Sequence, residues 1–171
     1  FSLHATVTTP YPSVTAQLTA WQIPKRYRFW LRQHQAVLVN GSYRYGNLPV
    51  VPGDVITMTL TAADPTAYVH ERHPLAIAYE DAHVLVVAKP AGVKPHPNQP
   101  DEAGTLMNWV AAYLAPQPAY ITHRLDMATS GLTLIAKDPL TQALLNQQLA
   151  TKTMARSYTA LVPAGIPAAG T

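Results

Sequence analysis

Apolar residues recur at helical spacing in two short stretches near the start of the chain. In residues 14–21 they return every three or four positions and follow Ser13, a residue type that favours helix N-termini, so we predict a helix there. Pro24 suits the first position of a second helix, which we expect to run to about Gln35.

Alternating apolar and polar residues predict strands after these two helices. Residues 36–39 end at Asn40-Gly41, a dipeptide that favours a tight hairpin turn, and the return strand would carry Tyr43 and Tyr45. A second turn at residues 52–54 leads into residues 55–60. Those residues alternate apolar side chains with threonine, which is typical of an edge or half-buried strand.

The remaining chain predicts a second set of elements. A proline-bracketed polar stretch at 64–74 is expected to be a solvated linker, and its His-Glu-Arg-His run lacks the spacing of a helical zinc motif. After it we expect a hairpin of residues 75–79 and 83–88 and then a stiff proline-rich loop over 89–97. A helix is expected over 105–114, with its aromatic residues in the core. The last expected elements are a short strand over 119–122, a strand after Gly131 and a helix over 138–152.

Charge separates these two parts of the chain. The 171 residues carry 12 Lys and Arg against 9 Asp and Glu, a net charge of +3. Residues 1–63 hold five basic residues and one acidic residue, whereas 64–171 hold seven basic and eight acidic ones. A small basic module joined to a near-neutral larger unit suggests that the first part binds a polyanion, although an ordinary solvated basic face would have the same composition.

Composition also excludes several classes of protein. The apolar fraction of 48% argues against a disordered chain, and the sequence has no apolar run long enough to span a membrane. With no cysteine there is no disulfide, thiol nucleophile or cysteine zinc site. The absence of cysteine and of an export signal favours a cytoplasmic location.

The second predicted helix aligns its cations. Lys25, Arg28 and Arg32 fall at positions i, i+3 and i+7, so they share one face, while Tyr27 and Leu31 lie on the opposite face. A basic stripe of this kind is typical of phosphate binding.

Polar residues concentrate between two predicted strands at 122–131. This short stretch holds Arg124, Asp126, Thr129 and Ser130 in a chain with only 21 charges, although a structural turn would use similar residues. An arginine two residues before an aspartate would keep the carboxylate ionised, as a nucleophile or base requires. The sequence has no G-x-S-x-G elbow, no glycine-rich nucleotide loop and no second carboxylate near Asp126, which disfavours hydrolase, nucleotide-cofactor and two-carboxylate glycosidase chemistry.

Both parts resemble known RNA-handling families. The first, with two short helices followed by V-L-V-N-G and V-P-G-D-V-I, resembles the S4-like RNA-binding module, and by position the RNA contacts would be Lys25, Arg26, Arg28 and Arg32. The stretch His-Arg-Leu-Asp-Met-Ala-Thr-Ser-Gly at 123–131 resembles the H-R-L-D-x-x-T-S-G motif of RluA-type pseudouridine synthases. The K-P-A-G-V run at 89–93 and the His-Pro at 96–97 are similar to that family's first motif. R-S-Y-T-A-L-V at 156–162 is similar to its K/R-x-Y-x-A-x-V strand, so the resemblance implies a strand there.

These resemblances imply an α+β protein with an RNA-binding module at 1–63, a linker at 64–74 and a mainly antiparallel catalytic domain from 75 to 171. They imply isomerisation of uridine to pseudouridine in RNA, with ribosomal RNA favoured over transfer RNA and no metal, organic cofactor or protein partner. Asp126 matches the catalytic aspartate, Arg124 an arginine that enters the RNA beside a flipped-out nucleotide, and Tyr158 a tyrosine that stacks on the base.

The chain also departs from the family pattern. After Tyr158 the family continues to a basic R-T-x-Q-I-R motif, which this sequence lacks. We therefore expect a fragment with an incomplete catalytic sheet, which leaves open the alternative of a catalytically inactive RNA-binding protein. Because the sequence begins at Phe1, we also expect a few residues to be missing from the amino terminus.

Overall fold

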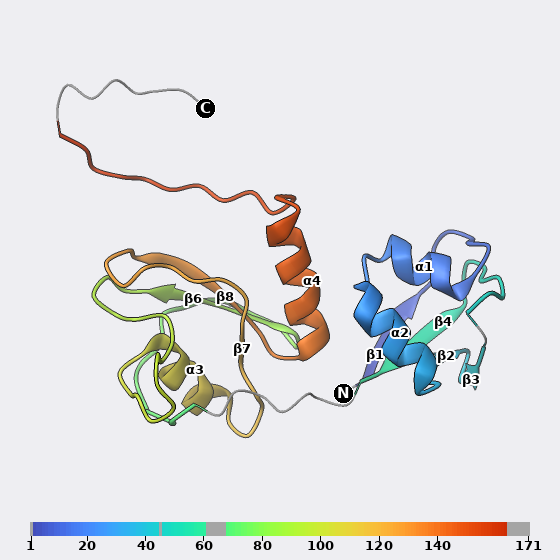
Figure 1. Ribbon diagram of the computed structural model, residues 1–171, viewed down its shortest axis with the longest axis horizontal. Coiled ribbons are helices and arrows are strands. Elements are labelled where there is room, and N and C mark those ends of the chain that lie inside the picture. The colour runs from blue at the N-terminus through green and yellow to red at the C-terminus, as the bar shows by residue number, and fades with distance from the viewer. Residues whose placement is uncertain (1, 45, 61–67, 164–171) are drawn as a thin grey trace.

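The chain builds two four-stranded antiparallel sheets, each covered by helices (Figure 1). The structure is a computed structural model and describes residues 2–44, 46–60 and 68–163. The first unit consists of β1 (Ser2–Thr6), α1 (Val14–Ala20), α2 (Lys25–Gln33), β2 (Val37–Val39), β3 (Ser42–Tyr43) and β4 (Val55–Thr59). The second consists of β5 (Ile77–Glu80), β6 (Val84–Lys89), α3 (Leu106–Leu114), β7 (Tyr120–Ile121), β8 (Gly131–Ala136) and α4 (Pro139–Ala150). The predicted α+β class is confirmed.

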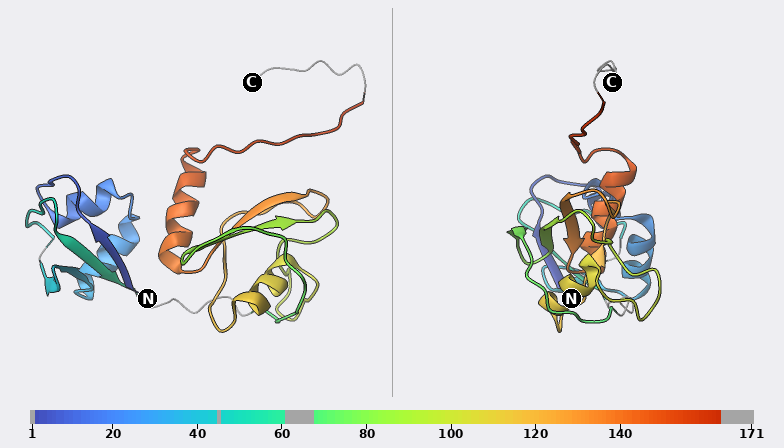
Figure 2. Two further views of the ribbon diagram at one scale, coloured as in Figure 1. Left: turned by 180° about the vertical axis from the view of Figure 1, so that it is seen from behind. Right: turned by 90° about the vertical axis from the view of Figure 1, so that its left-hand side faces the viewer.

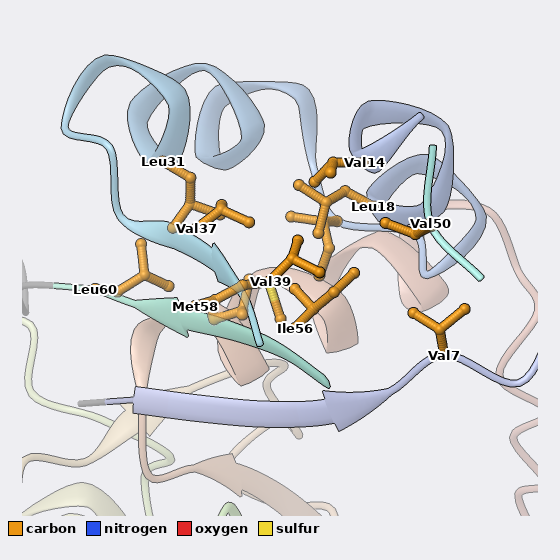
Figure 3. Close-up of a cluster of buried hydrophobic side chains, with 12 residues drawn as sticks. Val7, Val14, Leu18, Leu31, Val37, Val39, Val50, Ile56, Met58 and Leu60 are labelled. Carbon is orange, nitrogen blue, oxygen red and sulfur yellow. The ribbon is translucent and has the colours of Figure 1, made fainter. Parts of the chain in front are cut away.

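In the first unit, both helices lie on the same face of a sheet with strand order β1-β4-β2-β3 (Figures 1 and 3). Side chains from the helices and the sheet meet in one apolar core, in which Leu31 of α2 and Ile56 of β4 are fully buried. Burial of large apolar side chains is the main force that holds such a small unit together.

Local signals in this unit were largely correct. The Ser13 hydroxyl accepts a hydrogen bond from the Ala16 N–H at 3.0 Å, which caps α1 as predicted. Pro24 occupies the N-cap position of α2, one residue before the predicted first helical position. Asn40 and Gly41 have positive φ angles of 51° and 79°, as the predicted hairpin turn requires.

The sequence left open whether residues 55–60 form an edge or a half-buried strand, and β4 is the half-buried one, because it lies between β1 and β2. β1 was not predicted, although its residues alternate polar and apolar side chains as a half-buried strand does; it pairs with β4 far along the chain. Tyr45 of the expected return strand lies outside the described residues.

In the second unit, α3 packs on a sheet with strand order β5-β6-β8-β7. The predicted hairpin is confirmed as β5 and β6, and β8 begins at Gly131 as expected. Thr105 and Asn108 form a reciprocal capping box at the start of α3. Trp109 is buried in the core, but the same prediction for Tyr113 was wrong: its ring is half exposed and its hydroxyl donates to Glu80 at 2.8 Å.

Most of residues 68–74, within the predicted linker, are exposed, and the segment also contacts α3. The His73 ring stacks on Trp109 with centroids 3.7 Å apart, and the Asn108 amide donates to the Val69 carbonyl at 2.9 Å. Residues 64–67 of the expected linker lie outside the described part of the chain.

Helix α4 contacts both units. In Figure 1 it lies between the second sheet and the first unit, and the opposite view in Figure 2 agrees. Leu140 of α4 is fully buried in the apolar cluster of the first unit, and the Tyr27 hydroxyl donates to the Pro139 carbonyl at 3.0 Å. The start of α4 therefore joins the first unit to the second.

After α4 the chain is extended. The motif at 156–162 was expected to form a strand, but the described residues 153–163 pair with no strand and are almost entirely exposed. Among the helices that the structure describes, none has the length and apolar character needed to cross a membrane.

Candidate functional site

The polar stretch singled out in the sequence forms the loop between the paired strands β7 and β8. Near its start, the Thr122 hydroxyl donates to the Leu134 carbonyl, and the Leu134 N–H donates to His123 Nε2 at 3.1 Å. The side chain of Leu125 is buried, and the Thr129 N–H closes a turn on the Asp126 carbonyl at 3.0 Å. These contacts fix the backbone on both sides of Asp126.

Asp126 is exposed in this loop and lies near enough to the buried Lys89, at the end of β6, for its charge to act on the Lys89 ammonium. The Lys89 ammonium donates to three backbone carbonyls, those of Pro90 at 2.9 Å, Val93 at 2.8 Å and Met127 at 3.2 Å. Burial lowers the pKa of Lys89, and the nearby negative charge of Asp126 opposes that shift. A buried cation thus links the 89–93 loop to the residue that follows the candidate catalytic carboxylate.

Lys89 was quoted in the sequence as part of a motif, but its position at the site was missed. The signal was present, because Leu85, Val87 and Lys89 occupy alternate positions of one strand and all three face the core. A lysine on the buried face of a strand needs hydrogen-bond acceptors.

Arg124 does not pair with Asp126 as the sequence suggested. Both side chains are exposed, and among the described residues no ion pair involves either of them. The cation whose charge reaches Asp126 is Lys89. Arg124 is therefore available to a ligand approaching the loop from solvent.

The neutral ring of His123 holds the loop against β8. Burial lowers the pKa of its ring below the ordinary value of 6.5, and the positive charge of Arg156 adds to the shift. Since Nε2 accepts the Leu134 N–H, a protonated ring could not make this hydrogen bond.

A groove of about 630 Å³ lies beside the loop and contains Tyr158. Its lining includes His123, Leu125 and the 129–131 segment from the loop, together with residues 154–159 from the extended segment. Asp126 and Arg124 are absent from this lining, although their neighbours belong to it. Tyr158 is 65% exposed and lines this groove, whereas Asp126 does not.

The basic stripe of α2 lines a separate pocket in the first unit. Lys25, Arg28 and Arg32 surround it together with Arg44, a cation that sequence reasoning missed because it follows β3 and not the helix. Arg26 lies apart from these cations, with its guanidinium 4.9 Å from the centre of the Tyr27 ring.

In the described part of the chain, no group of three His, Cys, Asp or Glu side chains is placed to bind a metal ion. The geometry instead presents an exposed carboxylate on a well-anchored loop, an open groove beside it, and a cationic pocket in another unit.

Comparison with known proteins assigns a family to this arrangement. Residues 83–171 match the RNA pseudouridylate synthase family, and residues 1–56 match the RluD ribosomal pseudouridine synthase N-terminal domain. The chain therefore belongs to the RNA pseudouridylate synthase family, a family of isomerases.

Curated relatives agree with this assignment. An uncharacterized RNA pseudouridine synthase of Bacillus subtilis, YhcT, is 37% identical over 77% of this chain and 45% of its own length. The ribosomal large subunit pseudouridine synthase D of Xylella fastidiosa is 33% identical over 94% of this chain and 50% of its own length, and that of a Neisseria meningitidis serogroup B strain is 36% identical over 91% and 42%. The chain spans about half the length of the curated relatives it matches.

Proposed function

We propose that this protein is an RNA pseudouridine synthase that converts uridine to pseudouridine in structured RNA in the cytoplasm. The observation that carries the proposal is Asp126, an exposed carboxylate on an anchored loop within the family-matched region. As a working division, residues 1–63 bind RNA, 64–74 link the two units, and the chain from 75 onward carries the reaction.

The reaction needs no oxidant, reductant or cofactor. The bond between N1 of uracil and C1′ of ribose breaks, the base turns, and C5 bonds to C1′. The hydrogen on C5 is lost as a proton while N1 takes one up, so the product is an isomer of the substrate. Asp126 acts on the ribose, either as a nucleophile at C1′ or as a base at the neighbouring C2′.

Access to that bond requires an extruded nucleotide. A uridine stacked in a helix hides its glycosidic bond, and enzymes that modify bases take them out of the stack. Arg124, exposed beside Asp126, would occupy the space that the base leaves, and Tyr158, in the adjacent groove, would stack on the base.

The first unit would hold the surrounding RNA. Lys25, Arg26, Arg28 and Arg32 are the proposed phosphate contacts, and binding through them weakens as salt rises because each contact releases condensed counterions. Ribosomal RNA is favoured over transfer RNA because the matched N-terminal domain and the named relatives carry ribosomal descriptions.

Tritium release tests the assignment of Asp126. Ribosomal RNA transcribed with uridine tritiated at C5 loses tritium to water only when C5 forms the new bond. The product of the intact gene should release tritium, and Asp126→Asn should reduce release by at least a thousandfold while RNA binding is retained. Asp101→Asn, an exposed aspartate outside the β7–β8 loop, is the matched control and should remain active. Unchanged release by Asp126→Asn would remove the proposed role.

A second candidate function is RNA binding without catalysis by the 171-residue chain itself. It is favoured by the extended 153–163 segment, which leaves Tyr158 exposed and pairs with no strand among the described residues. Assaying this chain beside the intact gene product separates the two. Salt-sensitive RNA binding without tritium release by the short chain supports the second candidate, and release by both supports the first.

A further inference from the structure

The first unit contains a pocket that combines an apolar floor with cationic walls. It has a volume of about 250 Å³ and opens between α1, α2 and the segment after β3. Its inner end is formed by Val14, Leu18 and Val37, whose side chains are nearly fully buried and belong to the apolar core shown in Figure 3. Pockets for drug-sized ligands start at about 300 Å³, so this one suits a single ring system.

Two aromatic rings lie at this pocket with much of their surface in solvent. Phe29 of α2 is 57% exposed, although phenylalanine is among the most often buried residue types, and Tyr43 of β3 is 38% exposed. The Arg32 guanidinium lies 5.4 Å from the centre of the Phe29 ring. Exposed rings beside an arginine are the surfaces on which unpaired bases stack.

The charge around the pocket selects an anionic ligand. Lys25, Arg28, Arg32 and Arg44 all line it, and its described lining includes no carboxylate; Arg44 also forms an ion pair with Asp54 outside the lining, at 3.7 Å. Arg28 donates to the Thr19 hydroxyl, but its Nε is shielded from solvent and has no hydrogen-bond partner among the described residues. Four cations around an apolar floor match a nucleotide, which combines a flat base with a phosphate.

The wall of the pocket is formed before any ligand arrives. The Val14 N–H donates to the Leu48 carbonyl and the Thr15 N–H to the Gly46 carbonyl, each at 2.9 Å, which fixes residues 46–48 on the first turn of α1. A side chain at Gly46 would place its Cβ 2.6 Å from the Thr15 hydroxyl, so the two segments are as close as glycine permits. A preformed pocket binds with less ordering of the protein.

From these features we propose that the pocket binds one unpaired nucleotide of the RNA, separate from the uridine at Asp126. The base enters between Phe29 and Tyr43 above the apolar floor, and its phosphates lie against the four cations. This proposal rests on the proposed function in that the ligand is RNA. It adds that the first unit recognises a bulged or looped nucleotide and not only the backbone of a helix.

Two RNA stems distinguish this proposal from simple phosphate binding. One carries a single bulged 2-aminopurine nucleotide, and the other is identical except that the bulge is deleted. At one fixed salt concentration the intact protein should bind the bulged stem about 10-fold more tightly, a difference within the range that base–aromatic stacking produces. Stacking should also change the 2-aminopurine fluorescence.

Variants at Phe29 identify the pocket as the cause. Phe29→Ala and Phe29→Leu should abolish the preference while leaving affinity for the fully paired stem within about twofold, and Phe29→Tyr should retain it. Tyr79→Ala, which removes an exposed ring from β5, is the matched control and should bind like the unaltered protein. Arg32→Gln should weaken binding to both stems and reduce the salt dependence.

Each outcome decides between the proposals. Equal affinity for the two stems, or an equal loss on both stems in Phe29→Leu, would overturn the nucleotide pocket but not the modification of uridine. Binding to neither stem would contradict both the pocket and the proposed RNA binding. Tritium release without a preference for the bulged stem would leave the proposed function standing and remove this inference alone.

Discussion

Replacing Lys89 with methionine tests how the loop bearing Asp126 is held. The side chain is 1% exposed, and its ammonium donates to three carbonyls, two on the 89–93 loop and one at Met127. Methionine keeps most of the packing of the side-chain stem but leaves these carbonyls without their shared donor.

The magnitude follows from those three contacts. A hydrogen bond to a charged group contributes about 1.5–3 kcal/mol, and a buried acceptor left without a partner costs about 1–3 kcal/mol. Pro90 and Met127 are exposed, so water can reach their carbonyls, whereas Val93 is only partly exposed. We therefore expect Lys89→Met to lower the free energy of unfolding by about 2–4 kcal/mol, less than the sum over three bonds.

Urea unfolding measures this change, and Lys94→Met provides the control. Lys94 lies in the same proline-rich loop but forms a partly exposed ion pair with Glu102, so its loss should cost less than about 1 kcal/mol. Tritium release by Lys89→Met at a temperature where it remains folded should also fall, because the Asp126 loop loses its anchor. Equal unfolding free energies for the two variants would refute the argument.

Three further outcomes follow from other parts of the structure. Hydrogen bonds from the Val51 N–H and, to a smaller extent, the Asn40 amide lower the pKa of Asp54 below its ordinary 3.8. The stabilisation from the ionised carboxylate is therefore present above pH 3.8 and is lost as the pH falls through the lowered pKa. Asp54→Asn should flatten the acid limb of a stability–pH curve, and an unaltered acid limb would count against this role of Asp54. The pKa of His123 is lowered in the folded protein, so the stabilisation that its neutral ring provides is intact above pH 6.5 and is lost as the pH falls through the folded pKa. Amide exchange, corrected for its intrinsic pH dependence, should therefore show that protection of the Leu134 N–H falls as the pH is lowered below 6.5. Constant protection of this amide would contradict the hydrogen bond to His123. Leu140→Ala should lower the free energy of unfolding by about 2–5 kcal/mol, measured by heat or urea, because the side chain is fully buried in the apolar cluster of the first unit. The exposed Leu132→Ala should change it by almost nothing. Similar losses for the two variants would argue that α4 does not contact the first unit.

Local sequence signals predicted most of the elements correctly. The Ser13 cap, the Asn40-Gly41 turn and the Asp138 N-cap of α4 all act within a few residues, so the chain needs no distant partner to express them. The loop around Asp126 was also located correctly, because a polar stretch between two apolar strands can only be a connection.

Contacts between distant residues were less predictable. Local alternation of polar and apolar residues is present in β1, but its pairing with β4 is not visible in that pattern. Leu140 is buried because α4 reaches the first unit, which local periodicity does not reveal either. Tyr113 fits an amphipathic pattern, yet its hydroxyl bonds to Glu80 at the surface. The expected strand at 156–162 has no neighbour among the described residues, and a strand requires a partner for its backbone groups.

At the site, too, short-range patterns were predicted correctly and contacts between distant residues were missed. The sequence indicated Asp126 and the basic face of α2, because both follow from short-range patterns. It did not indicate that Lys89 approaches Asp126 from another strand, or that Arg44 joins three helix cations around one pocket. Both depend on how the strands and helices pack.

Nucleoside analysis of the treated RNA tests the central claim most directly. Ribosomal RNA free of modification is incubated with the product of the intact gene, digested to nucleosides and separated by chromatography. We predict that pseudouridine appears as an equal amount of uridine is lost, and that Asp126→Asn binds the same RNA but forms none. Pseudouridine formed at an undiminished rate by Asp126→Asn, or none formed by an unaltered protein that binds the RNA, would contradict the account.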